Sequence, residues 1–142
     1  MNGRRILSSI FAAVVVLSFG ACAPRGNGVF DNDQSQLTLR QMQSRTFDTG
    51  DKNRTMRTVI QTLQDLSFAV DKADEELGSI SGIKLDGYAL RMTVTVFPRG
   101  EAKMVVRANA QYNITPVVDP EPYQRFFAAL EKSMFLAAQE VD

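Results

Sequence analysis

Hydrophobic and polar side chains alternate most regularly between residues 90 and 112. The alternation runs through two segments, 90–97 and 104–112, which are separated by a Pro-Arg-Gly-Glu turn at 98–101. The apolar positions are Leu90, Met92, Val94, Val96, Met104, Val106, Ala108, Ala110 and Tyr112. Because successive side chains of a strand point to opposite faces, this pattern predicts a long antiparallel hairpin with one apolar face.

Two other segments have the spacing of amphipathic helices. The first covers about residues 50–66, after a capping segment at 48–51, and its apolar side chains are Met56, Val59, Ile60, Leu63 and Leu66. The second runs from about Pro122 to Val141, and its apolar stripe is Tyr123, Phe126, Phe127, Leu130, Met134, Ala137 and Val141. Each helix therefore has one face that needs cover.

The remaining segments predict shorter strands at 37–47, 67–73 and 77–85, a turn at Asp86-Gly87, and a proline-containing loop at 115–122. Gly78 and Gly82 favour a bend or bulge in the third of these segments. We therefore expect one α+β domain over residues 37–142. Its two layers are an antiparallel sheet of about four strands, in the order strand–helix–strand–strand–strand–helix, and two amphipathic helices that cover one sheet face.

The N-terminal segment has the form of an export signal. Arg4 and Arg5 precede an apolar run at 6–19, which is too short for an ordinary membrane-spanning helix. Gly20-Ala21-Cys22 follows and resembles the lipobox of bacterial lipoproteins, although Phe19 stands where the family has an aliphatic residue. The resemblance implies cleavage after Ala21 and a diacylglycerol on Cys22. Two alternatives remain: an ordinary secretory signal with an incidental cysteine, and an uncleaved anchor.

Residues 1–21 are thus expected to be a lipoprotein signal peptide, and residues 22–36 a lipidated cysteine followed by a flexible tether. Position 23 is Ala, whereas Asp there would suggest retention in the inner membrane of enterobacteria. We therefore expect the periplasmic leaflet of the outer membrane, with the inner membrane as the alternative.

Composition excludes several classes of function. Lys and Arg number 16, as do Asp and Glu, and loss of Arg4 and Arg5 with the signal would leave an excess of two acids. This balance argues against a general nucleic-acid binder. The chain has no His and one Cys, so it has no His-based zinc site, no His-dependent catalytic triad and no internal disulfide.

No set of side chains makes a convincing catalytic, metal or cofactor site, and we expect none of the three. The acidic cluster Asp71, Asp74, Glu75 and Glu76 lacks the spacing of a calcium loop and is typical of a solvated turn. Ser79, Ser81 and Thr93 would need Lys72 or Lys84 as a base. The segment 78–82 has two glycines but not the pattern of a phosphate loop.

Part of the chain resembles a group of short, largely uncharacterised lipoproteins of Gram-negative bacteria. The matching features lie between about residues 40 and 87. They are Gln43-Ser44-Arg45 with Phe47-Asp48-Thr49, Leu63-Gln64-Asp65 with Phe68, Ala73-Asp74 with Leu77-Gly78, and Lys84. The resemblance implies an anchored envelope protein and supplies no catalytic residues.

The last helix carries apolar side chains outside its stripe. Phe135 falls about 100° from Met134 on a helical wheel, and Leu136 about 200°. Either the tether or residues 116–122 cover them, which we take as the expected case, or they form a surface for a partner. The sequence as a whole predicts a membrane-anchored, non-catalytic binding or accessory module of an envelope complex. The alternative is a carrier or receptor for a small apolar or lipid ligand.

Overall fold

The computed structural model describes residues 36–139, which form a mixed α+β fold around an antiparallel six-stranded sheet. The signal segment, Cys22 and the tether lie outside the described residues. The strands are β1 (Ser44–Phe47), β2 (Ala69–Asp74), β3 (Ser79–Asp86), β4 (Tyr88–Pro98), β5 (Met104–Tyr112) and β6 (Thr115–Pro116). The helices are α2 (Lys52–Asp65), α3 (Glu121–Gln139) and a short helix at 36–42. The class is as predicted, but the estimate of about four strands is too low.

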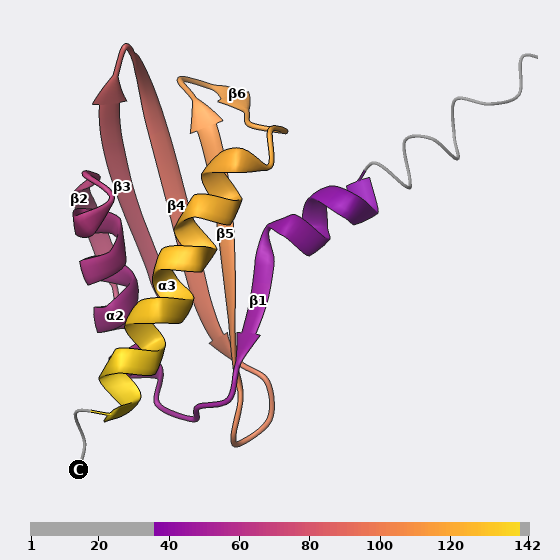
Figure 1. The fold of residues 1–142 in the computed structure, drawn as a ribbon, viewed down its shortest axis with the longest axis vertical. Helices are drawn as coiled ribbons and strands as arrows, with labels where there is room; N and C mark the ends of the chain where they lie inside the picture. The colour runs from indigo at the N-terminus through magenta and orange to yellow at the C-terminus, as the bar shows by residue number, and fades with distance from the viewer. Residues whose placement is uncertain (1–35, 140–142) are drawn as a thin grey trace, which may run out of the picture. The chain divides into compact units, whose positions relative to one another are not determined.

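The strands lie in the order β1-β5-β4-β3-β2, and the two-residue β6 pairs with β5 (Figure 1). The long hairpin of β4 and β5 is confirmed, with Val94 opposite Ala108 and Val96 opposite Val106. These four side chains are fully buried. The predicted apolar face of the hairpin is therefore the floor of the core.

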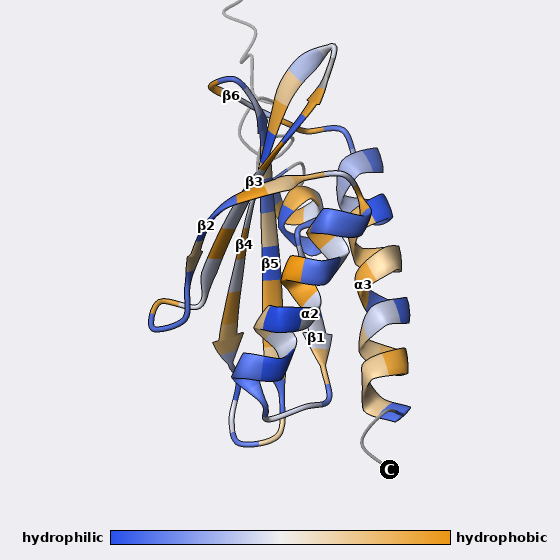
Figure 2. Ribbon diagram, turned by 90° about the vertical axis from the view of Figure 1, so that its left-hand side faces the viewer, coloured by the Kyte–Doolittle hydropathy of each residue, from blue (hydrophilic) through white to orange (hydrophobic). Residues whose placement is uncertain are grey.

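Both long helices pack on the same face of the sheet (Figure 2). Asp51 caps α2, since its side chain accepts a hydrogen bond from the backbone N–H of Arg54 at 2.9 Å. Met56, Val59 and Leu63 bury the apolar side of α2, as the spacing predicts. The other face of the sheet carries no helix within residues 36–139, and its polar side chains include Ser81 and Thr93, whose hydroxyls are 2.9 Å apart.

The prediction of a strand over residues 37–47 is wrong for its first half. Residues 36–42 are helical, and only Ser44–Phe47 pairs, with Met104–Arg107 of β5. Just before the strand, the carbonyl oxygen of Gln43 accepts a hydrogen bond from Ala108 N at 2.8 Å. Beyond this point the hydroxyl of Tyr123, from α3, accepts a hydrogen bond from Ala110 N of β5, so β1 does not pair further along β5.

The predicted irregularity near Gly78 and Gly82 is present, and each glycine has its own reason. Gly78 has a φ of +68°, and a Cβ there would lie 2.2 Å from the carbonyl oxygen of Val96. Gly82 lies opposite Val70, where the register of β2 shifts before Lys72. The bulge is therefore in β2, the partner strand, rather than in the segment that contains the glycines.

The hydroxyl of Tyr123 joins three parts of the chain inside the core. Tyr123 is fully buried near the start of α3. Its hydroxyl donates to the carbonyl oxygen of Val117 at 2.8 Å and accepts from Ala110 N and from Gln43 Nε2, both at 3.2 Å. One side chain thus fixes α3, the loop before it and the edge of β5 relative to one another.

Charge placed on the two faces of β4 is expected to have opposite consequences. Val94→Asp buries a carboxylate with no partner, at an expected cost of several kcal/mol out of the roughly 5–15 kcal/mol that a domain typically has. Thr93→Asp places the same charge on the face without helices and is expected to be tolerated. Thermal unfolding of both variants checks this, and equal melting temperatures would show that the faces are assigned wrongly.

Removal of the Tyr123 hydroxyl is expected to destabilise the domain. Tyr123→Phe leaves the Val117 carbonyl and the Ala110 N–H without this partner, at a cost of about 1–3 kcal/mol. The melting temperature should fall by roughly 5–15 °C. Tyr112→Phe is the control, because Tyr112 is 42% exposed and its melting temperature should stay close to that of the parent. An equal effect in both variants would rule out the buried hydroxyl as the cause.

Candidate functional site

The sheet is longer than the helices that cover it, and one hollow of the described domain follows from this mismatch. The 11 residues of β4 extend over about 37 Å at the usual rise of a strand. The 14 residues of α2 extend over only about 21 Å, and the 19 of α3 over about 28 Å. Part of the helix-facing side of the sheet is therefore left without a helix above it.

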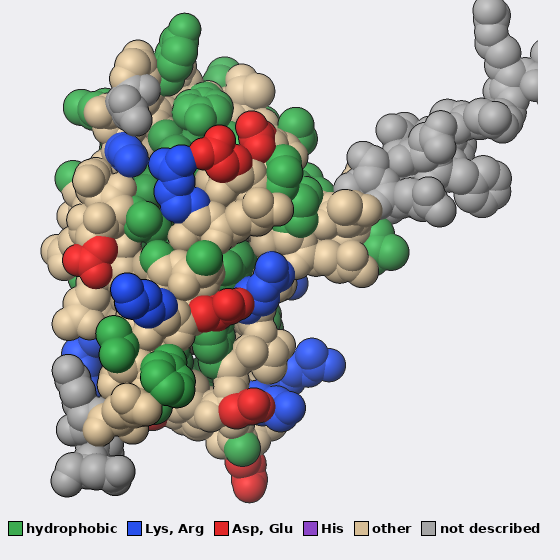
Figure 3. Space-filling model, in the orientation of Figure 1, with side chains coloured by type: hydrophobic (Ala, Val, Ile, Leu, Met, Phe, Trp, Pro, Cys, Tyr) green, Lys and Arg blue, Asp and Glu red, His purple; other side chains and the backbone are tan. Residues whose placement is uncertain are grey.

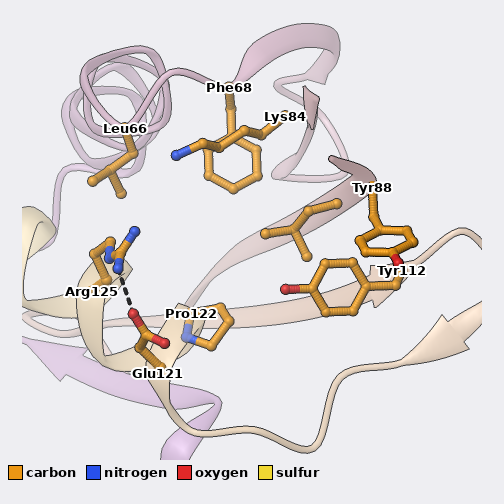
Figure 4. A pocket seen from close by; sticks show the side chains of 9 residues that line it. Leu66, Phe68, Lys84, Tyr88, Tyr112, Glu121, Pro122 and Arg125 are labelled. Atoms are coloured by element: carbon orange, nitrogen blue, oxygen red, sulfur yellow. Dashed lines mark hydrogen bonds and ion pairs between the residues drawn. The ribbon is translucent and has the colours of Figure 1, made fainter. Parts of the chain in front are cut away.

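The first hollow, which we call the turn-end pocket, lies where the sheet extends past the end of α2 and the start of α3 (Figure 4). It has a volume of about 250 Å³. Its lining residues are Leu66, Phe68, Lys84, Tyr88, Leu90, Tyr112, Glu121, Pro122 and Arg125. The pocket combines an apolar floor with two cations and one carboxylate.

Three strands and one helix supply the polar groups of the turn-end pocket. Lys84 lies opposite Leu90 in the register of β3 and β4, and Leu90 lies opposite Tyr112. Figure 4 shows the Lys84 side chain passing beside the ring of Phe68, with the ammonium group directed into the hollow. Arg125 is paired with Glu121 one helical turn earlier. Lys84 has no hydrogen-bond or ion-pair partner within residues 36–139.

The second hollow, the α3 groove, lies at the opposite ends of the same helices. Its volume is about 430 Å³, and its lining residues are Phe47, Asp48, Thr49, Arg54, Glu131, Met134, Phe135 and Ala138. Asp48 is 3.3 Å from the ammonium of Lys103, and Glu131 is 3.6 Å from the guanidinium of Arg45. One terminal nitrogen of Arg54, Nη2, is buried without a hydrogen-bond partner among the described residues. The groove thus has four apolar and four polar side chains along it, and one nitrogen of the half-buried Arg54 is enclosed.

Phe135 lines this groove and is 63% exposed, whereas Leu136 is 50% exposed and does not line it. The expectation that residues 116–122 cover them is wrong, because that segment precedes α3 and lies at its other end. The tether, the other expected cover, lies outside the described residues. By contrast, Tyr123, Phe126 and Leu130 of the predicted stripe are fully buried. The helical wheel thus separated the buried from the exposed side chains correctly, while the expected cover was misplaced.

Four of the side chains considered for catalysis or metal binding are engaged in structural contacts. Asp71 forms an ion pair with Arg91 at 2.8 Å, and Asp74 accepts a hydrogen bond from Leu77 N at 2.9 Å. Ser81 is paired with Thr93 rather than with a lysine. Within residues 36–139, no three His, Cys, Asp or Glu side chains lie together in a way that would hold a metal ion.

Sequence reasoning missed the turn-end pocket. In the sequence, Lys84 stands out only as a possible base for a serine and as part of the family resemblance, and Tyr88 does not stand out. A signal was present, because Lys84, Leu90 and Tyr112 fall on one sheet face once the hairpin register is set. Whether a helix covers these side chains depends on where α2 ends. The register of the sheet alone therefore does not predict the pocket.

The chain shows no significant sequence match to any protein-family model or to any curated protein. Among residues 36–139, no helix is both long enough and apolar enough to cross a membrane. The features of this chain that bear on its function are therefore the geometry of the two hollows, the exposed side chains and the N-terminal sequence.

Proposed function

We propose that this chain is a periplasmic lipoprotein, held on the outer membrane through Cys22, whose domain is a non-catalytic binding module of an envelope complex. The anchor is supported by the sequence alone: two arginines, an apolar run and Gly20-Ala21-Cys22 in the required order. Two or three acyl chains would hold such a protein on a membrane almost permanently, because each buried CH₂ contributes about 0.8 kcal/mol.

The observation that carries the binding role is the exposed end of α3. Phe135 presents a large apolar side chain at the α3 groove, and Leu136, one residue further on, presents another to solvent outside the groove. Grouped apolar surface beside a groove is typical of a site for another protein.

The alternative, a carrier for an apolar or lipid ligand, has less support. A carrier would need a cavity between the helices and the sheet, yet Leu63, Val94 and Phe126 there are fully buried. Typical ligand pockets have about 300–1,000 Å³ and are mostly apolar. The turn-end pocket at about 250 Å³ is smaller than that, and the α3 groove at about 430 Å³ has polar side chains at half of its lining positions. The closed core therefore favours binding at the surface.

Lipidation is tested at its only cysteine. Cys22→Ser removes the one thiol in the chain and is expected to abolish incorporation of labelled palmitate and to release the protein from membranes. Cys22→Ala should give the same result. A serine variant that still takes up label and fractionates with membranes would show that the chain is not a lipoprotein.

The partner surface is tested with one charge and a matched control. Leu136→Asp places a carboxylate on the exposed side of α3 and is expected to leave the melting temperature almost unchanged, while partners captured by crosslinking are lost. Gln64→Asp places the same charge near the end of α2, at an exposed position away from the groove, and should retain those partners. Unchanged capture by Leu136→Asp, or a large fall in its melting temperature, would contradict the assignment.

A further inference from the structure

The most exposed large hydrophobic side chains of the described domain gather around the turns near the turn-end pocket. Ile114, between β5 and β6, is 90% exposed, Leu85 of β3 is 82% exposed, and Tyr88 of β4 is 73% exposed. The β3–β4 turn and the β5–β6 turn lie at the same end of the sheet (Figure 1). In the space-filling view, hydrophobic side chains cover this upper end, and charged side chains lie just below it (Figure 3).

The kinds of side chain at this end are those found at a membrane interface. Tyr88 packs edge-on against Tyr112, with ring centroids 6.5 Å apart, so two amphipathic rings stand side by side. Tyrosine is enriched at the level of lipid headgroups because it has an apolar body and a polar tip. Leu85 and Ile114 extend from the turns beside them and have no polar group to solvate.

The charges beneath the apolar turns are suited to a phosphate. Lys84 has a free ammonium within the described residues, and Arg125 is the second cation of the pocket. Because Glu121 pairs with Arg125, Lys84 is the cation of the pocket left to meet a phosphate. Asp119 accepts a hydrogen bond from Glu121 N at 2.9 Å, and Asp86 lies in the β3–β4 turn. In a lipid leaflet the phosphates lie outside the acyl chains. A cation that lies one level behind apolar side chains can therefore meet a phosphate while those side chains enter the leaflet.

We propose that this end of the sheet docks on the surface of a phospholipid bilayer. Ile114, Leu85 and Tyr88 enter the interface, and Lys84 meets a lipid phosphate at the mouth of the turn-end pocket. A pocket of about 250 Å³ accommodates a headgroup but not a whole lipid, so the lipid stays in its leaflet.

The inference rests on the proposed function only because the anchor would hold the domain near a membrane. The chemistry of the contact does not depend on the anchor. Residue 36 lies fourteen positions after Cys22, and that length of chain spans at most about 50 Å when fully extended. A domain tethered at that distance meets the bilayer at an effective concentration on the order of millimolar. A weak docking surface is therefore sufficient to orient it.

The chain contains no tryptophan, so one introduced tryptophan reports on its surroundings without background. The full chain with Ile114→Trp is mixed with vesicles of phosphatidylethanolamine and phosphatidylglycerol. Its emission is expected to shift to shorter wavelength and to lose intensity when the acyl chains are brominated. Tyr88→Trp is a second reporter at the same end, in case Ile114→Trp alters the turn. Arg99→Trp, in the turn at the opposite end of the sheet, is the control and should show neither change.

Lys84→Gln, combined with the Ile114 reporter, tests the role of charge. Docking should weaken about fivefold on vesicles with phosphatidylglycerol, and less on zwitterionic vesicles, where the cation of each headgroup balances its phosphate. Attachment of the chain is scored separately, by flotation and palmitate incorporation. A chain that floats with vesicles while Ile114→Trp and Tyr88→Trp match the Arg99 control would overturn the docking and leave the anchor standing. Quenching of both reporters without palmitate would support docking and overturn the anchor.

Discussion

A sheet with a single apolar face is the constraint on which the rest of this domain depends. The β4–β5 hairpin supplies a dense row of Val, Met and Ala side chains, and burial of such a row is the largest favourable contribution to folding. Only α2 and α3 cover it within the described residues, and both are shorter than β4. The centre of the core is consequently closed, and the turn-end pocket and the α3 groove lie toward the ends of the helices. The fold thus leaves its binding surfaces at its ends.

The two proposed surfaces lie at opposite ends of the domain. The turn-end pocket is beside the end of α2 and the start of α3, whereas the α3 groove is beside the start of α2 and the end of α3. A domain that rests on a bilayer through its apolar turns directs the α3 groove away from the lipid. An accessory protein with this arrangement is suited to contact a partner that projects from the membrane.

The parts of the fold that depend on local pattern were predictable, and those that depend on distant contacts were not. Alternation identified the hairpin and its buried face, and helical spacing identified α2 and the buried side of α3. The helix at 36–42 was missed because the start of β1 is set by β5 and by the Tyr123 hydroxyl, which lies 80 residues after Gln43. The helical wheel placed Leu136 outside the buried stripe, yet cover by another segment was expected, and the turn-end pocket required the relative lengths of helix and strand. The role of Cys22 remains a prediction from sequence.

The hydrogen bonds along the outer edge of β5 also bear on self-association. After Arg107, where pairing with β1 ends, Ala108 N bonds to Gln43 O, Ala110 N bonds to the Tyr123 hydroxyl, and Ala110 O accepts from Val117 N. Neighbouring copies on a membrane are confined to two dimensions, where an open strand edge would template strand addition from one molecule to the next. Side-chain and loop groups occupy those sites on β5, and the bulge and charges of β2 interrupt the opposite edge. On the β5 side the sheet ends in the four residues of β1, so crowding on a lipid surface would find only those four residues as an edge for strand addition.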